Sequence, residues 1–188
     1  MKSVLISIQP KWCELIASGK KTVEVRKTKP KLEPPFKCYI YCTKGKGDCL
    51  WRWNGIWYDT QDPKHRPNRL DGKIIGEFVC DDVTRIINFI THFGVERRSE
   101  SELNTIARAS CLDYMDMLGY LGTDKDGYAW HISDLKIYDH PKKLSEFRRD
   151  CPDNVRSCAM CKHGDYTGMK CTPIARPPQS WCYVEEVE

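Results

Sequence analysis

The sequence predicts an α+β protein in which a mixed or antiparallel sheet, or a small β-barrel, carries a few inserted helices. Two observations predict this fold class. Short segments with alternating apolar residues or dense β-branched and aromatic residues recur along the chain, many of them bounded by glycine or proline. Between them, two stretches show the three- and four-residue spacing of helices. Because 188 residues suffice for one sizeable core, we expect a single domain over residues 1–188.

The N-terminal part predicts a strand, a short helix and two more strands. Residues 4–8 alternate as a strand would, and Pro10 then stands where a helix can start. Gly19 closes that helix. The next strand lies within SGKKTVEVRKTKPK, residues 18–31, and another spans residues 37–43.

The stretch WRWNGIWYDT predicts a β-hairpin, because Asn-Gly is the preferred pair for a two-residue type I′ turn. The expected register pairs Trp53 with Ile56, Arg52 with Trp57, and Trp51 with Tyr58. Two roles remain open for these side chains. One face would pack on the sheet, while Arg52 and Trp57 would be the exposed candidates for stacking on bases.

The second half of the chain predicts a long strand, then helices, then strands again. Residues 72–89 are strand-like, with Gly76 as a candidate bulge. Over residues 99–120 the helical spacing predicts one or two helices, and Ser99 with Glu102 forms a candidate capping box. The remaining predicted strands lie within residues 127–139 and 180–188.

The charge is unevenly distributed. The whole chain carries a formal +4, which says little about partners, but residues 11–46 hold ten Lys or Arg against three Glu, or 10 − 3 = +7. A basic N-terminal part indicates a polyanionic partner such as a nucleic acid or phosphate. No apolar run approaches the length that spans a bilayer, so we expect no membrane partner.

The spacing Gly19-x-Lys21-x-x-Glu24-x-Arg26 resembles the signature of the ASCH (activating signal cointegrator homology) superfamily. Members of that superfamily have a PUA-like β-barrel with a cleft beside this motif. Gly72-Lys-Ile-Ile-Gly-Glu-Phe and Gly127-Tyr-Ala-Trp-His-Ile are similar to later strands of the family. The resemblance covers residues 3–42, 72–88, 126–147 and 180–187. It leaves two insertions outside, the aromatic hairpin and loop at residues 50–70 and a cysteine-rich segment at residues 148–178.

The resemblance implies that Lys21, Glu24 and Arg26 line a basic cleft that binds RNA or a nucleotide. The strand containing Trp130 and His131 would line the same cleft, and since strand neighbours point to opposite faces, only one of the two can face it. Lys21 has the parity of the valines at 23 and 25, so it can join Glu24 only from the turn after Gly19. The competing hypothesis is a solvated surface salt-bridge cluster of little energetic value.

An enzymatic hypothesis uses the same residues. Some ASCH members deacetylate acetylated cytidine with a Lys, a Thr and a Glu. Lys21 matches the first, Glu24 stands where the Thr is expected, and the remote Glu has no clear counterpart. Hydrolysis of a modified nucleoside, or ribonuclease activity with Lys21 and Glu24 as catalytic groups, is therefore the alternative to binding. In a third hypothesis the cleft is vestigial and the chain is a structural or regulatory interaction protein. This hypothesis predicts that Lys21 is solvated and paired only with Glu24.

The cysteines predict a metal site. Cys151, Cys158, Cys161 and Cys171 lie in a polar stretch that has little material for a core of its own, and four thiolates with one CxxC step suit a structural, tetrahedral zinc site. His163 is a candidate replacement for one cysteine. Free cysteines in a disordered insertion are the alternative. The N-terminus lacks an export signal, so we expect reduced thiols and a cytoplasmic location.

Overall fold

The computed structural model of the chain describes residues 2–44, 51–53, 56–58, 70–86, 100–122, 126–149 and 173–186. They belong to two compact units, each assembled from segments far apart in sequence. The first unit contains Met1–Pro10, Lys37–Glu77 and Lys136–Glu188, and the second contains Lys11–Phe36 and Phe78–Leu135. Across the described ranges, no helix combines the length and the hydropathy needed to cross a membrane.

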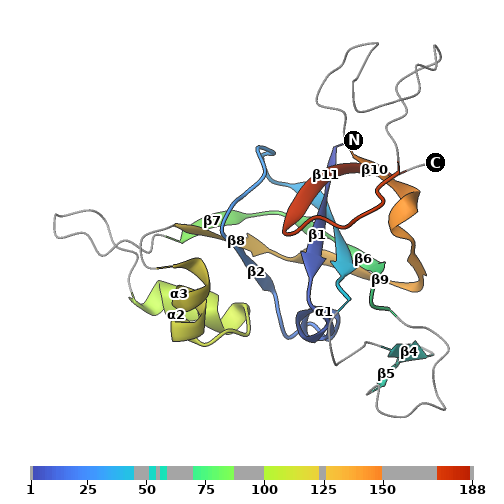
Figure 1. Cartoon of the computed structure of the whole chain (residues 1–188). Coiled ribbons are helices and arrows are strands. Elements are labelled where there is room, and N and C mark those ends of the chain that lie inside the picture. The colour runs from blue at the N-terminus through green and yellow to red at the C-terminus, as the bar shows by residue number, and fades with distance from the viewer. Residues whose placement is uncertain are drawn as a thin grey trace. The chain divides into compact units, whose positions relative to one another are not determined.

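The main element of the first unit is a six-stranded sheet in the order β10-β11-β1-β3-β6-β9 (Figure 1). Strand β1 pairs in parallel with β3 and antiparallel with β11, so the sheet is mixed, as predicted. The ends of β6 and β9 continue into the second unit. The strands are β1 (Ser3–Ile8), β3 (Phe36–Cys42), β6 (Lys73–Cys80), β9 (Ser133–Lys142), β10 (Phe147–Arg149) and β11 (Trp181–Glu186).

Strand β1 is buried along its whole length, including its two serines. The Ser7 hydroxyl donates to the carbonyl of Pro178 at 2.6 Å, and the Ser7 N–H donates to the carbonyl of Ser180 at 2.8 Å. A buried hydroxyl needs such a partner, which explains why a serine is tolerated here. One core cluster of this unit consists of Leu5, Tyr39, Tyr41, Ile74, Phe147, Ile174 and Val184.

The predicted hairpin is present in the first unit, with the predicted register. Strands β4 (Trp51–Trp53) and β5 (Ile56–Tyr58) pair antiparallel, and Arg52 lies opposite Trp57. The turn residues Asn54 and Gly55 lie outside the described residues.

The second unit combines a three-stranded antiparallel sheet, in the order β2-β8-β7, with three helices. Its elements are α1 (Pro10–Ala17), β2 (Val23–Arg26), β7 (Val83–Ile86), α2 (Glu100–Ala109), α3 (Tyr114–Leu121) and β8 (Gly127–His131). Gly19 ends the first helical segment with a φ of 73°, in the left-handed region that glycine adopts most easily. The predicted helix start at Pro10 and the glycine stop are confirmed.

Residues of the strands and of α2 and α3 build the core of the second unit. Its buried members are Val25, Ile86, Leu103, Ala107, Met117, Leu121 and Ala129. Helix α3 begins where the carboxylate of Asp113 accepts a hydrogen bond from the Met115 N–H, which satisfies one donor of the first turn. Residues 99–120 were predicted to form one or two helices, and two are present, α2 and α3; Ser99 of the candidate capping box lies outside the described residues.

The predicted long strand over residues 72–89 is wrong. It is interrupted at Asp81 and Asp82 and forms β6 in one sheet and β7 in another. The side chain of Asp82 accepts from the Thr84 hydroxyl, and its carbonyl accepts from the His131 N–H, so this residue bonds locally and to β8. Gly76 permits a close approach to β9, because a Cβ there would lie 2.4 Å from the Lys136 carbonyl oxygen.

The α+β class with a mixed sheet is confirmed, whereas the closed barrel is not. The described strands pair into sheets of six, three and two strands, and none of the three is ordered as a closed ring in the described part of the chain. The barrel, the single-domain organisation and the insertion boundaries at residues 50–70 and 148–178 stay predictions.

Candidate functional site

The segment before β2 is held in place by α1 and by the turn between α2 and α3. The Lys21 N–H donates to the carbonyl of Leu15 at 2.9 Å, and the Thr22 N–H donates to that of Ala109 at 2.9 Å. The Cys111 thiol lies 3.3 Å from the carbonyl oxygen of Lys20. Lys21 therefore stands in the turn after the helix rather than in the strand, as its parity required.

Lys21, Glu24 and Arg26 form a buried ionic group, which we call the β2 cluster. The Lys21 ammonium lies 3.3 Å from one carboxylate oxygen of Glu24, and Arg26 lies 2.9 Å from the other. The side chains are only 2%, 9% and 8% exposed. Two cations thus share one carboxylate away from bulk water, where charge interactions are stronger than at a surface.

Two further groups complete the surroundings of the Lys21 ammonium. It donates a 2.7 Å hydrogen bond to the backbone carbonyl of Ser110, whose residue is fully buried. It also lies 5.2 Å from the centre of the Trp12 ring, within cation–π range. The vestigial hypothesis predicted a solvated Lys21 paired only with Glu24, and that prediction is wrong.

The pairing of β2 with β8 determines which side chains share a face of the sheet. Glu24 lies opposite Trp130, and Val25 lies opposite Ala129. Opposed residues point to the same side, so Trp130 is on the side of Glu24 while Val25 and Ala129 face the helices. Trp130 is completely buried and packs edge to face against Phe36, with ring centres 5.8 Å apart.

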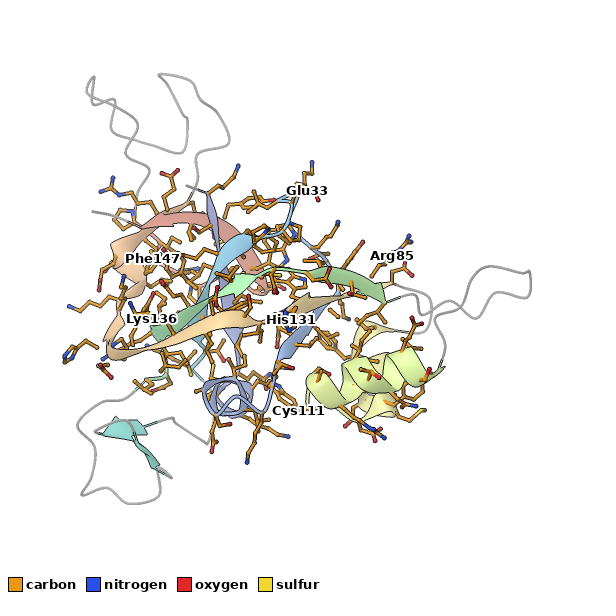
Figure 2. The ribbon with its side chains drawn as sticks, turned by 180° about the vertical axis from the view of Figure 1, so that it is seen from behind. Glu33, Arg85, Cys111, His131, Lys136 and Phe147 are labelled. Carbon is orange, nitrogen blue, oxygen red and sulfur yellow. The ribbon has the colours of Figure 1, made fainter. Side chains whose placement is uncertain are left out.

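His131 occupies the opposite face from Trp130 and is solvent-exposed at the end of β8 (Figure 2). Its Nδ1 lies 2.6 Å from a carboxylate oxygen of Asp81. This hydrogen bond is the main reason that the pKa of Asp81 is lowered from its ordinary value. Of the two residues predicted on this strand, the structure brings Trp130 to the side of the β2 cluster and does not bring His131 there.

Exposed lysines surround the β2 cluster in sequence, and we call them the lysine rim. Its members are Lys11, Lys20, Lys27, Lys29 and Lys31. Within residues 18–31 the solvated-run hypothesis is therefore right for the lysines at 20, 27, 29 and 31 and wrong for the β2 cluster.

Aromatic rings accompany two rim lysines. The Lys27 ammonium lies 5.2 Å from the ring centre of Tyr120 on α3, and that of Lys11 lies 4.7 Å from the ring centre of Trp12. Sequence reasoning missed Trp12, Ser110 and Tyr120 as neighbours of the cluster. Ser110 contributes only a backbone carbonyl from a position 89 residues away, so no local pattern could have identified it.

The predicted zinc ligands Cys151, Cys158, Cys161 and Cys171, and the alternative ligand His163, lie outside the described residues. Among the residues with a described placement, no group of three or more His, Cys, Asp or Glu side chains is arranged to hold a metal. The side chains of Cys13, Cys38, Cys42 and Cys80 are buried. Burial raises the pKa of the Cys80 thiol to about 12, as expected for a small apolar core residue.

The sequence matches one known protein family. The model of the ASCH domain matches residues 6–132, more than half of the chain, including α1, β2 and β8. The chain belongs to the ASCH domain family. A comparison with the curated proteins found no match.

Solved structures of an ASCH protein from Zymomonas mobilis share the fold of this ASCH domain. One matches with a TM-score of 0.55 and 17% identity over 99% of this chain and 98% of that protein. Two mutant forms of the Zymomonas protein match with TM-scores of 0.53 and 0.52, each at 18% identity, over 98% and 97% of this chain and 91% and 88% of the mutants. At this identity the likeness extends to the fold alone.

Proposed function

We propose that this ASCH domain binds RNA or a nucleotide at the surface around β2. The observation that carries the proposal is the arrangement of charge in the second unit. Five exposed lysines accompany a buried cluster in which two cations share one carboxylate. Such a surface attracts phosphate groups, because each lysine that neutralises a phosphate releases the counterions bound to the nucleic acid.

The exposed lysines, rather than the β2 cluster, are the proposed phosphate contacts. The Lys21 ammonium already donates a hydrogen bond to the Ser110 carbonyl and forms a salt bridge with the Glu24 carboxylate, and only 2% of the Lys21 side chain is exposed. The proposed role of the cluster is to hold β2 and the α2–α3 turn together and to add positive potential beneath the rim. Direct contact of Arg26 with a base edge or a phosphate is the finer version of the proposal.

The test is the salt dependence of RNA affinity, measured by fluorescence anisotropy with a short labelled oligouridylate. We expect the Lys27→Ala/Lys29→Ala protein to bind more weakly. The slope of log K against log salt should fall in magnitude by about 1.4, since each phosphate contact on a single strand contributes ~0.7. Lys136→Ala removes an exposed lysine of the first unit and serves as the matched control. An unchanged slope in the double variant, or no binding by the wild-type protein, would contradict the proposal.

Lys21→Met separates the role of the cluster from that of the rim. The substitution keeps most of the length of the side chain and removes its charge. If Lys21 only supports β2, the salt slope stays that of the wild-type protein, whereas a Lys21 that contacts a phosphate lowers it by about 0.7. The slope is compared on protein shown by circular dichroism to be folded.

The alternative function is hydrolysis of a modified nucleoside or of RNA, with Lys21 and Glu24 as acid–base groups. It is favoured by one observation, the 3.3 Å contact between the two side chains in a water-poor setting. Incubating the protein with acetylated cytidine and with a short RNA, followed by chromatography, tests it. Absence of product from the wild-type protein at high enzyme concentration would remove this alternative.

We also propose that Cys151, Cys158, Cys161 and Cys171 bind one structural zinc, with His163 as the candidate substitute ligand. The proposal draws on the spacing and on the shortage of apolar residues between them. Reduced cysteines are needed for this site, which agrees with the proposed cytoplasmic location. Elemental analysis of protein purified without chelator should give about one zinc per chain. A value close to zero would overturn the proposal.

A PUA-like β-barrel is proposed from the family resemblance, and it would require the described sheets to close into one barrel.

A further inference from the structure

Tyr120 on α3 is one of two large apolar side chains that are markedly exposed among the described residues, and 42% of it is accessible to solvent. Helix α3 is anchored by Met117 and Leu121, which are both fully buried in the core of the second unit. The helix therefore places Tyr120 at the surface of the second unit. An aromatic ring fixed at a surface is a ready stacking platform for a flat ligand group.

The charged groups around Tyr120 are those of the β2 region. The Lys27 ammonium lies 5.2 Å from the ring centre. Burial of the hydroxyl end raises the pKa of Tyr120, while the charge of Arg26 lowers it and that of Glu24 raises it. The charges of two cluster members thus act on the phenol, and the ammonium of a rim lysine lies over its ring.

A second aromatic side chain also carries a rim lysine. Trp12 on α1 is partly exposed, and its ring centre lies 4.7 Å from the ammonium of Lys11 and 5.2 Å from that of Lys21. Each ring is therefore paired with one exposed rim lysine, and Trp12 also lies beside Lys21 of the β2 cluster.

We propose that Tyr120 and Trp12 are base-stacking residues of a site for single-stranded RNA, with Lys27 and Lys11 as the phosphate contacts beside them. This inference rests on the proposed function and assigns its substrate class. Alternation of rings and cations suits a single strand, whose unstacked bases are free to lie on aromatic faces while lysines follow the backbone. The exposed lysines lie over the rings in the free protein, and a base that displaces one of them releases its ammonium for the phosphate.

The experiment compares two strands and two Tyr120 variants. The strands are a short labelled RNA and the same RNA with abasic positions, and the variants are Tyr120→Leu and Tyr120→Phe. We expect Tyr120→Leu to bind the intact RNA roughly 5- to 140-fold more weakly, the equivalent of one stacked base. Tyr120→Phe keeps the ring and should bind within about twofold of wild type, since the stacking term depends on the aromatic face. The abasic strand should bind wild type and Tyr120→Leu equally.

Met115→Ala is the matched control, because Met115 lies on the same helix and is 68% exposed but carries no ring. It should leave the affinity unchanged. Tyr120→Leu should also leave the salt slope unchanged, while Lys27→Ala lowers it by about 0.7.

Two outcomes separate this inference from the function beneath it. Salt-dependent RNA binding that Tyr120→Leu does not weaken, or weakens equally for the intact and abasic strands, overturns the stacking site and leaves the proposed function standing. Failure of the wild-type protein to bind either strand overturns both.

Discussion

Two groups of charged side chains in this ASCH domain have similar chemistry but different exposure. In the β2 cluster a carboxylate lies between Lys21 and Arg26, and all three side chains are less than a tenth exposed. In the first unit Glu77 accepts from the Tyr138 hydroxyl at 2.5 Å and lies 3.3 Å from the ammonium of Lys37. We call these three the β6 cluster.

The difference between the two clusters is burial. The Lys37 side chain is 44% exposed and that of Glu77 20%, so water screens this pair and replaces its partners when it is broken. The β2 cluster has no such replacement, because its ions are removed from solvent. Loss of one charge is therefore costly in the β2 cluster, while the charges available to a ligand lie on the rim.

The largest expected effect is that of Glu24→Gln. The substitution keeps the shape of the side chain and leaves Lys21 and Arg26 buried without their shared carboxylate. We expect the free energy of unfolding at neutral pH to fall by about 3–5 kcal/mol, the usual cost of removing one partner from a buried ion pair. Urea unfolding followed by circular dichroism measures it. A loss below about 1 kcal/mol, typical of surface pairs, would contradict the described burial.

Glu77→Gln is the same substitution in the β6 cluster. Its expected cost at neutral pH is about 1 kcal/mol, mainly because a neutral amide oxygen accepts a weaker hydrogen bond from Tyr138 than a carboxylate does. Burial raises the pKa of Glu77, but the hydrogen bonds from Tyr138 and Lys37 outweigh it, so the pKa lies below its ordinary 4.5. The ionised carboxylate therefore adds stability above pH 4.5, and this stability is lost as the pH falls through the lowered pKa.

The pH dependence of that difference is the measurement. The gap in unfolding free energy between wild type and Glu77→Gln should be largest at neutral pH and should shrink below pH 4.5. If the difference in unfolding free energy instead widens as the pH falls, the pKa of Glu77 is raised in the folded protein rather than lowered.

The smallest effect on stability belongs to the rim. Lys27→Ala/Lys29→Ala should change the free energy of unfolding by no more than about 0.5 kcal/mol, because both side chains are exposed. The same protein should lose RNA affinity, so we expect substitutions in the rim to weaken binding with little loss of stability. A destabilisation above about 1 kcal/mol would contradict the prediction that the rim lysines contribute little to stability.

Sequence patterns predicted the parts of the fold that depend on neighbours along the chain. The Asn54-Gly55 pair specified the register of β4 and β5, and Pro10 and Gly19 marked the limits of α1, because turn and cap geometry are local. The interruption at Asp81 and Asp82 was missed. An apolar run continues on both sides of these residues, and only the pairing of β7 with β8 shows that the strand changes sheets.

The sequence predicted the charged residues of the candidate site on and before β2, but it did not predict the residues from other segments that surround them. Parity together with Gly19 placed Lys21 beside Glu24. The carbonyl of Ser110 and the ring of Tyr120 reach the same region through the packing of α2 and α3 against the sheet, and packing between distant segments leaves no period in the sequence. Burial of the cluster was missed for the same reason, since a dense charge run by itself indicates a solvated surface.

The proposed binding site for single-stranded RNA lies across the rim and the rings of the second unit. Photo-crosslinking with RNA that contains 4-thiouridine, followed by mass spectrometry of the protein, tests it most directly. We predict crosslinks in the peptides that contain Trp12, Lys27 and Tyr120, and fewer of them in Tyr120→Leu. Crosslinks confined to peptides of the first unit, such as those containing Lys136 or Tyr183, would contradict the claim.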